Sequence, residues 1–339
     1  MKDPFAKTEV KIAVIGGGTG SFTMLSALKK YTTQIAAIVS MADDGGSTGV
    51  LRDELGTLPP GDVRQCLVAL SDSPKVRELF EYRFDTGTFS GHSFGNVLLT
   101  ALEKISGDFS QAVETASEIL RISGTVIPAT LDDVRLKMEW EDKSLVLQGE
   151  RVIDAGNFQH DPRVAKLSLI PAAGANPVAI AAIEQADVVV VAPGDLYTSL
   201  GPLLVIDGIG KALANTKAKT FYVANLVSKQ GQTDGFTVSD HAAEIERFAG
   251  TDFLDYVLYN AEAPSKDIAK RYEDEGGYVT RADEENLSSQ HYATVGGDFL
   301  GKMASANNAD TLIGKRSLIR HDAEAVAKLI LALYHKHEA

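Results

Sequence analysis

Cysteine is nearly absent from this sequence of 339 residues, which contains a single one, Cys66. One thiol excludes an internal disulfide and a zinc site built on several thiolates, although it leaves a lone nucleophilic thiol open. Cys66 shares one face of a predicted helix with Val63, Leu67 and Leu70. Because a free cysteine in such a place normally packs as a small hydrophobic side chain, we interpret Cys66 as a core residue.

Long apolar runs are also absent. No run reaches the roughly 18 residues needed to cross a bilayer, and the first residues lack the apolar stretch and small-residue cleavage site of a signal peptide. The 44% hydrophobic and 23% charged residues are ordinary for a folded, enzyme-sized protein. These features predict a cytoplasmic protein without a membrane span.

Basic residues are outnumbered: 33 Lys and Arg stand against 46 Asp and Glu, a formal net charge of −13. This charge opposes nonspecific binding to nucleic acid or to an anionic membrane. The N–H groups at helix starts still supply local positive potential, so an acidic protein can bind a small anion. We expect small-molecule or protein partners and no nucleic acid, with a homo-oligomer left open.

The N-terminal part predicts a strand, turn, helix and strand. The apolar run 11–15 is followed by a glycine-rich turn, a helical pattern at 22–30 and a second apolar run at 34–40. In the second half, apolar strands alternate with helical patterns at 177–185, 188–191, 201–214, 220–224, 239–248 and 256–259. Such alternation predicts a mostly parallel sheet covered by helices on both faces.

Two segments interrupt this alternation. Helical patterns fill residues from about 62 to 121, and two β-favouring stretches around the polar turn 141–143 predict an inserted β-hairpin at about 134–154. We therefore predict one domain, residues 1–339. Its fold class is α/β, a doubly wound, mostly parallel sheet with a helical segment and an inserted β-hairpin.

The turn after the first strand is the first candidate site. Glycines let the backbone approach a phosphate closely, and the N–H groups of the following helix point at it. The residues concerned are Gly16, Gly17, Gly18, Thr19 and Gly20. A dinucleotide fingerprint, G-x-G-x-x-G, ends here on Ser21, which argues against classical NAD binding. A tight turn without a ligand is the structural alternative.

The loop after the second strand is the next candidate, because it should lie beside the first at the carboxyl edge of the sheet. Its carboxylates, hydroxyls and nearby arginine are Asp43, Asp44, Ser47, Thr48 and Arg52. Adjacent carboxylates can hold Mg²⁺ or accept sugar hydroxyls, and an arginine can bind a phosphate with two parallel hydrogen bonds. Asp62 adds a carboxylate at the start of a helix; helix capping by Asp62 and a solvated loop at 43–49 are the alternatives.

Residues 91–95 match the G-x-S-x-G pattern of a hydrolase nucleophile elbow, but loop-like residues precede them instead of an apolar strand. We interpret His92, Ser93 and Asn96 as polar groups that face one cleft at the start of a helix. His92 is a candidate general base, with a hydrogen-bonded structural histidine as the alternative.

Polar residues follow two strands of the second half. Gly194, Asp195, Tyr197, Thr198 and Ser199 come after strand 188–191, and Asn225 follows the next strand. Tyr272 and Arg320 are further candidates; Arg320 could pair with a phosphate or form an ordinary surface salt bridge. The seven histidines show no zinc-ligand spacing.

Several of these motifs together resemble the gluconeogenesis factor family, the YvcK-type branch of the CofD-like proteins. They are residues 16–20, 43–52, 60–62, 91–96 and 193–199, in order along nearly the whole chain. The resemblance implies a Rossmann-like fold, a cytoplasmic bacterial protein, and a role in growth on gluconeogenic carbon sources and in cell shape and envelope synthesis. It also implies binding of UDP-sugars such as UDP-N-acetylglucosamine without an established reaction.

The related CofD branch transfers 2-phospho-L-lactate to a deazaflavin from a guanylylated donor, with Mg²⁺ near acidic residues. By matching motifs, Asp44 and Asp62 would be the metal-side carboxylates. This sequence reads Pro-Gly-Asp-Val-Arg at 60–64, where the transferases have a Pro-Asp-x-Asp-type segment. That departure puts deazaflavin transfer in doubt.

The leading hypothesis is a nucleotide-sugar-binding regulatory protein, with the diphosphate on the 16–20 loop and Arg320 near it. Sugar or ribose hydroxyls would bind Asp43, Asp44 and Asn225. The alternative is an Mg²⁺-dependent phosphoryl or phospholactyl-type transferase in which Asp44 and Asp62 hold the metal against a nucleotide-diphosphate donor.

Overall fold

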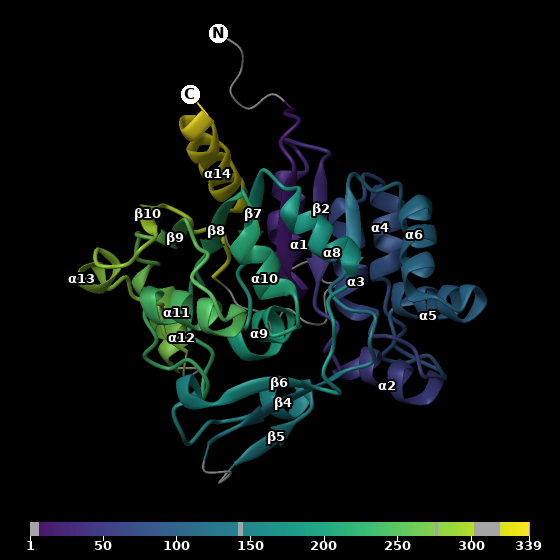
Figure 1. Ribbon diagram of the computed structural model, residues 1–339. Helices are drawn as coiled ribbons and strands as arrows, with labels where there is room; N and C mark the ends of the chain where they lie inside the picture. The colour runs from purple at the N-terminus through teal and green to yellow at the C-terminus, as the bar shows by residue number, and fades with distance from the viewer. Residues whose placement is uncertain (1–6, 142–144, 275–276, 302–318, 339) are drawn as a thin grey trace.

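The computed structural model describes residues 7–141, 145–274, 277–301 and 319–338. Its centre is a seven-stranded sheet with the order β10-β9-β8-β7-β1-β2-β3, in which every neighbouring pair is parallel (Figure 1). The strands are β1 (Ile12–Gly16), β2 (Ile35–Val39), β3 (Thr125–Pro128), β7 (Val188–Val191), β8 (Lys219–Val223), β9 (Tyr256–Asn260) and β10 (Ala293–Gly297). The chain winds outward from β1 to β3 and then returns to β7, so the winding direction reverses between β1 and β7. The predicted doubly wound, Rossmann-like α/β fold is confirmed.

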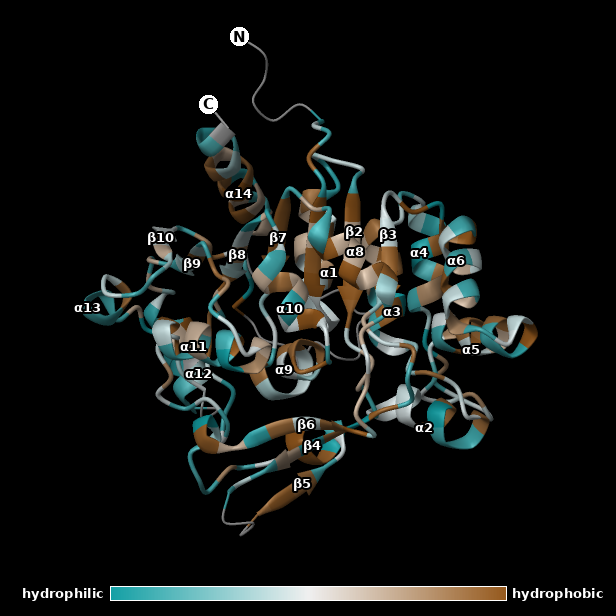
Figure 2. Ribbon diagram, in the orientation of Figure 1, coloured by the Kyte–Doolittle hydropathy of each residue, from teal (hydrophilic) through white to brown (hydrophobic). Residues whose placement is uncertain are grey.

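Helices cover both faces of this sheet because its strands are apolar on both sides (Figure 2). Ile12 and Val14 pack with the helices of one face, α1 (Gly18–Leu28), α3 (Gly61–Leu70), α6 (Phe109–Leu120) and α14 (Ala323–Glu338). Ala13 and Ile15 point the other way, as alternate strand residues must, and join a second core with α8 (Pro177–Glu184), α10 (Ile209–Asn215) and α11 (Val238–Ala249). Cys66 is fully buried in the first core, as expected.

The predicted helical segment contains α3, α4 (Pro74–Glu81), α5 (Phe94–Ser106) and α6. The helix α2 (Gly46–Leu55) was not predicted, since it begins inside the glycine-rich stretch that the sequence assigned to a loop. Leu51 and Arg52 are buried on its inner face, and Gly56 ends it in the left-handed conformation. Tertiary packing therefore overrides the low helix propensity of Gly46 and Gly49.

The predicted helix at 201–214 is interrupted. A π-helical turn at Leu196–Leu200 leads into the short α9 (Gly201–Leu204), and α10 begins only at Ile209. Gly208 separates the two with a φ of 100°, which a helix cannot contain. The remaining helices are α7 (Glu150–Asp154), a 3₁₀ turn (Pro162–Val164), α12 (Lys266–Asp274) and α13 (Glu284–Leu287). Within the described residues, no helix is both long and apolar enough to span a bilayer.

The predicted hairpin is present as β4 (Arg135–Glu139) and β5 (Val146–Gln148), and the tip 142–144 lies outside the described residues. It belongs to a three-stranded antiparallel sheet, because β6 (Lys166–Ile170) pairs with the other side of β4. Figure 1 shows this small sheet below the main one. Its buried Leu136 and Met138 join the core that contains α11, so the insertion packs on the main domain and does not extend its sheet.

Candidate functional site

The loops after β1 and β7 meet at the point where the winding reverses, the usual ligand position in open α/β sheets. A Cβ on Gly20 would lie 1.7 Å from the carbonyl oxygen of Pro193, so only glycine allows these two backbones to touch. Gly17 is the N-cap of α1 and gives it no side-chain cap, while Gly16 and Gly17 are buried and Thr19 is exposed. The start of α1 therefore offers backbone N–H groups to an anion, and part of the glycine pattern is explained by packing.

Asp62, at the start of α3, faces the start of α1. Its carboxylate accepts a hydrogen bond from the N–H of Gly18. Burial, and then the negative charge of Asp43, raise the pKa of Asp62 to about 7. Asp62 does not cap its own helix, α3, whose N-cap Pro60 provides no side-chain cap; it accepts instead from the start of α1, at the edge where a ligand is predicted.

Asp43 and Asp44 point to different partners. Asp43 accepts hydrogen bonds from the N–H of Gly45, at 2.8 Å, and from the Thr48 hydroxyl, and burial raises its pKa. Asp44 accepts from the N–H groups of Glu150, at 3.1 Å, and Arg151, at 2.8 Å, so it caps α7 of the insertion. Asp43 thus belongs to the edge of the main sheet, and Asp44 fastens the small sheet to it.

Glu150 completes a group of carboxylates that the sequence did not predict, since it lies in the insertion and no local motif marks it. Burial, and then the charges of Asp43, Asp154, Asp44 and Asp62, raise the pKa of Glu150 to about 9. The residues that converge on this position come from the loop after β2, from α3 and from α7. The site therefore gathers acidic side chains where an anionic ligand is predicted, and the raised pKa keeps Glu150 protonated there at neutral pH.

The resemblance places Mg²⁺ at Asp44 and Asp62, and these two carboxylates cap different helices. Among the residues that the structure describes, no group of three or more His, Cys, Asp and Glu side chains is placed to hold a metal ion. Mg²⁺ often takes only one or two protein carboxylates and completes its shell with water and phosphate oxygens. Asp62 with Asp43 beside it fits that pattern better than Asp62 with Asp44, and the Mg²⁺ site stays a prediction.

The structure brings together the predicted polar groups of the 43–49 and 91–96 segments. Asn96 accepts from Arg64 Nε at 2.8 Å and donates to the Ser47 hydroxyl at 3.2 Å, and Ser47 Oγ lies 2.9 Å from His92 Nδ1. Ser93 is fully buried, and its Oγ caps α5 by accepting from the Asn96 N–H at 3.3 Å. A buried capping serine that does not contact His92 is not a hydrolase nucleophile.

Gly194 and Asn225 join the loops after β7 and β8. Gly194 N–H donates to Asn225 Oδ1 at 3.2 Å, and Asn225 Nδ2 donates to the Gly194 carbonyl at 2.8 Å. Next to them, Asp195 Oδ2 lies 2.7 Å from Lys229 Nζ, a cation that the motifs do not reveal. Thr198 is buried and Ser199 partly buried in the following turn, and Ser199 N–H donates to the Asp195 carbonyl at 3.0 Å.

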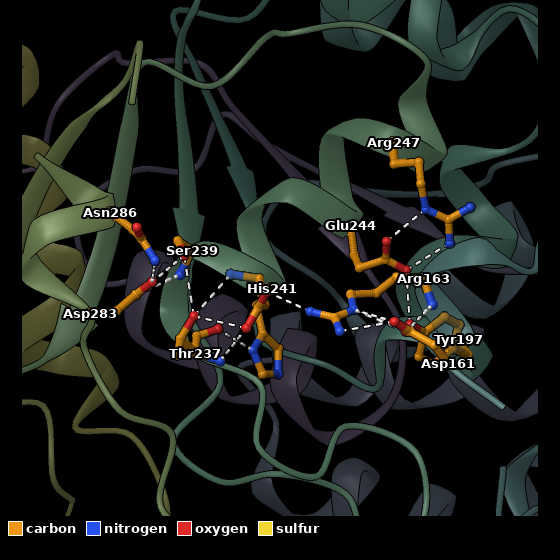
Figure 3. A network of polar contacts seen from close by, with 11 residues as sticks. Asp161, Arg163, Tyr197, Thr237, Ser239, His241, Glu244, Arg247, Asp283 and Asn286 are labelled. Carbon is orange, nitrogen blue, oxygen red and sulfur yellow. Dashed lines mark hydrogen bonds and ion pairs between the residues drawn. The ribbon is translucent and has the colours of Figure 1, made fainter. Parts of the chain in front are cut away.

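Two predicted ligand residues are engaged elsewhere. Tyr197 is fully buried, and its hydroxyl donates to Glu244 Oε2 at 2.8 Å in the network of Figure 3, so it does not reach the carboxyl edge. Arg52 is buried and hydrogen-bonded to Asp133, to the carbonyl of Val134 and to the carbonyl of Asp43. Glu244 and Asp133 are distant in sequence from Tyr197 and Arg52, so the residues near each motif could not reveal these partners.

Tyr272 contacts Ile319, the residue before Arg320, near the carboxyl end of β8. The Tyr272 hydroxyl accepts from the N–H of Ile319 at 3.1 Å, and these two residues pack with Leu226. Arg320, partly buried, is followed by His321, whose Nε2–H donates to the Ala224 carbonyl at 3.0 Å. Burial lowers the pKa of His321 to about 4, so this histidine is neutral and fixes the backbone of Arg320 beside the site.

Comparison with known proteins agrees with this architecture. A sequence model of the family described as 2-phospho-L-lactate transferase CofD matches residues 12–300. The gluconeogenesis factor of Bacillus subtilis is 37% identical over 327 residues, covering 95% of this chain and 98% of that protein. The gluconeogenesis factor of Listeria monocytogenes is 35% identical over 330 residues and 96% of each chain. The crystal structure of protein BH3568 from Bacillus halodurans superposes with a TM-score of 0.86 at 35% identity, covering 96% of this chain and all of that one.

Proposed function

Because the chain belongs to the CofD family, within its gluconeogenesis factor branch, we propose that it is a regulatory protein that binds a nucleotide sugar of the UDP-N-acetylglucosamine type. The observation that carries the proposal is the convergence of four polar loops, those after β1, β2, β7 and β8, on the edge where the winding reverses. The candidate nucleophiles Cys66 and Ser93 are fully buried, which favours binding over covalent catalysis.

Each part of such a ligand has a counterpart in the site. The diphosphate would bind the N–H groups at the start of α1, with Arg320 near it. Hydroxyls of the ribose or sugar would donate to Asp43, whose neighbour Asp44 positions the insertion. Asn225 holds Gly194 in place and leaves the backbone of that loop close to the ligand.

In the cell, we assign this binding to the cytoplasm, to growth on gluconeogenic carbon sources and to cell shape and envelope synthesis. The support is the function named for the relatives in Bacillus subtilis and Listeria monocytogenes, which match nearly the full chain. The gluconeogenic role is the part that those names carry. The role in cell shape rests on the motif resemblance.

Isothermal calorimetry tests the ligand class. UDP-N-acetylglucosamine and UDP-glucose are expected to bind, and GDP and NAD to bind more weakly or not at all. Absence of measurable binding by any uridine nucleotide would contradict the proposal. Binding of GDP alone would favour a transferase of the other branch.

The second candidate is an Mg²⁺-dependent phosphoryl or phospholactyl-type transferase. The observation in its favour is the Asp43 and Asp62 pair beside the start of α1, where a diphosphate would lie. Mg²⁺ would neutralise the charge of a nucleotide-diphosphate donor, and Asp62 would orient it. This candidate requires product formation from such a donor, and Asp62→Asn should abolish that activity. A folded protein that binds the ligand without Mg²⁺-dependent turnover would argue against a transferase.

A further inference from the structure

Lys229 lies between the main sheet and the insertion. It follows β8, and its Nζ is 2.7 Å from Asp195 Oδ2, in the loop after β7, while it also pairs with Asp154 Oδ1 at the end of α7. Burial by itself lowers the pKa of Lys229, but the two carboxylates more than offset that effect and hold it above its ordinary value. The lysine is therefore charged and joins three parts of the fold.

The backbone of Lys229 is fixed by its own turn. Its N–H donates to the Thr233 hydroxyl at 2.8 Å, and Gln232 Nε2 donates to the carbonyls of Ile153, at 2.8 Å, and Asp154, at 3.0 Å. The side chain of Lys229 is 25% exposed, and that of its partner Asp154 is 48% exposed. The turn thus holds the lysine at the edge, while its flexible side chain can change partner without moving the backbone.

Three arginines around this edge, Arg52, Arg64 and Arg135, bond to groups of the protein, whereas Arg320 is already assigned to the diphosphate. Arg52 bonds Asp133 and two carbonyls, Arg64 bonds Asn96, and Arg135 pairs with Asp53 and lies 3.7 Å from Asp44. Burial, and then the charges of the neighbouring carboxylates, already raise the pKa of Glu150 at this edge. A diphosphate entering this edge adds further negative charge, and Lys229 is a second cation beside Arg320 that can reach it.

We propose, on the basis of the function proposed above, that Lys229 binds the phosphates of the ligand. To do so it breaks its ion pair with Asp154, which removes one contact that holds the small sheet to the main domain. An ion pair with a half-exposed carboxylate is weak, and a phosphate offers more charge and several acceptor oxygens. Occupancy of the edge is thereby transmitted to α7, in which Asp154 is the last residue. The contacts that hold the insertion therefore depend on whether the ligand is bound.

Calorimetry on the full chain with UDP and with uridine tests the contact. Lys229→Gln is expected to weaken UDP binding by at least about tenfold, the loss of one charge-assisted hydrogen bond, and to leave uridine binding unchanged. Lys219→Gln is the matched control, since Lys219 also pairs with an aspartate, Asp255, at 3.3 Å, but at the opposite edge of the sheet. It is expected to bind UDP as the natural protein does.

The outcomes separate the two proposals. If the natural chain binds no uridine nucleotide, the proposed function fails. If it binds UDP and a folded Lys229→Gln variant, judged by its thermal midpoint, binds UDP equally well, the role of Lys229 is overturned and the function stands.

Asp154→Asn tests the exchange of partners independently. Removing the carboxylate that competes for Lys229 is expected to tighten UDP binding two- to fivefold. Unchanged or weaker UDP binding in this variant would overturn the exchange, even if Lys229 contacts the phosphates.

Discussion

The carboxylate of Asp62 occupies the space that a side chain at position 17 would need: a Cβ on Gly17 would lie 2.2 Å from Asp62 Oδ2. A side chain at position 17 would therefore have to displace the carboxylate of a residue 45 positions along the chain, at the start of α3. The contact places a partly buried carboxylate against the N–H groups of α1, where an anionic ligand is proposed. The same contact couples the geometry of the glycine loop to the charge of Asp62.

Gly17→Ala is expected to lower the free energy of unfolding by about 1–3 kcal/mol, because the Asp62 carboxylate must move from its place at the Gly18 N–H. Urea unfolding measures the change. Asp62→Ala removes the obstructing atoms, so the double variant should be more stable than the sum of the single changes predicts. Additive effects would show that the two residues do not interact.

Glu150 should make the protein less stable as the pH rises. In the unfolded chain Glu150 has its ordinary pKa of 4.5, whereas in the folded protein its pKa is about 9. Between these two pH values the side chain is ionised in the unfolded state and protonated in the folded state, so a rise in pH stabilises the unfolded state. Glu150→Gln removes this loss and should raise the free energy of unfolding at pH 8.5 by about 1 kcal/mol or more, with a smaller gain at pH 6.

Urea unfolding at pH 6, 7, 8 and 8.5 checks this pH dependence, with Glu78→Gln on the exposed face of α4 as the control. The free energy of unfolding of the Glu78→Gln control should change with pH in the same way as that of the natural protein. If the free energy of unfolding of Glu150→Gln also changes with pH in the same way as that of the natural protein, the Glu150 carboxylate is not destabilised by its neighbours.

Tyr197→Phe should lower the free energy of unfolding by about 1–3 kcal/mol, because the buried Glu244 loses the donated hydrogen bond and keeps Arg247 as its partner (Figure 3). Tyr278→Phe, at a tyrosine that is 49% exposed, is the control and should have little effect. Chemical unfolding distinguishes the two. A loss of UDP affinity in Tyr197→Phe without a loss of stability would instead place the hydroxyl in the binding site.

Asn225→Asp should weaken UDP binding by about tenfold and lower the thermal midpoint. A carboxylate can accept from the Gly194 N–H, but it cannot donate to the Gly194 carbonyl, and it brings two oxygens into repulsive contact there. Asn215→Asp, at the exposed end of α10, makes the same chemical change away from the edge. Equal effects of the two substitutions would indicate a general charge effect and no role for Asn225 in positioning Gly194.

The sequence predicted the central strands of the main sheet but neither of its edges. β1, β2 and β7 are fully apolar runs, because both of their faces are covered. β3 ends in Pro128, and β10 reads Ala-Thr-Val-Gly-Gly with mostly exposed or partly buried residues, so neither carries the pattern of a buried strand. Edge strands form because a partner is already present, and that information is not local.

The same limit applies to the site. The glycine turns and the Ser47, His92 and Asn96 cluster follow from motifs that lie near one another in sequence or at the same sheet edge. Glu150 reaches the site only through the folding of the insertion, and Lys229 lies in the loop after β8, six residues beyond the end of that strand, where no motif marks it. Tyr197 was predicted as a ligand residue because hydroxyl side chains surround it in sequence, but the π-helical turn directs it into the core, toward Glu244.

The position of β1 has a consequence for synthesis on the ribosome. β1 pairs with β2 on one side, only about 20 residues later, but its other partner, β7, is about 175 residues later. A nascent chain that has completed β3 therefore presents the apolar strand Ile12–Gly16 with one row of backbone hydrogen-bonding groups open. For much of translation β1, an interior strand of the finished sheet, is therefore an edge strand, and a chaperone that shields it until residue 191 emerges would protect the chain from pairing with another copy.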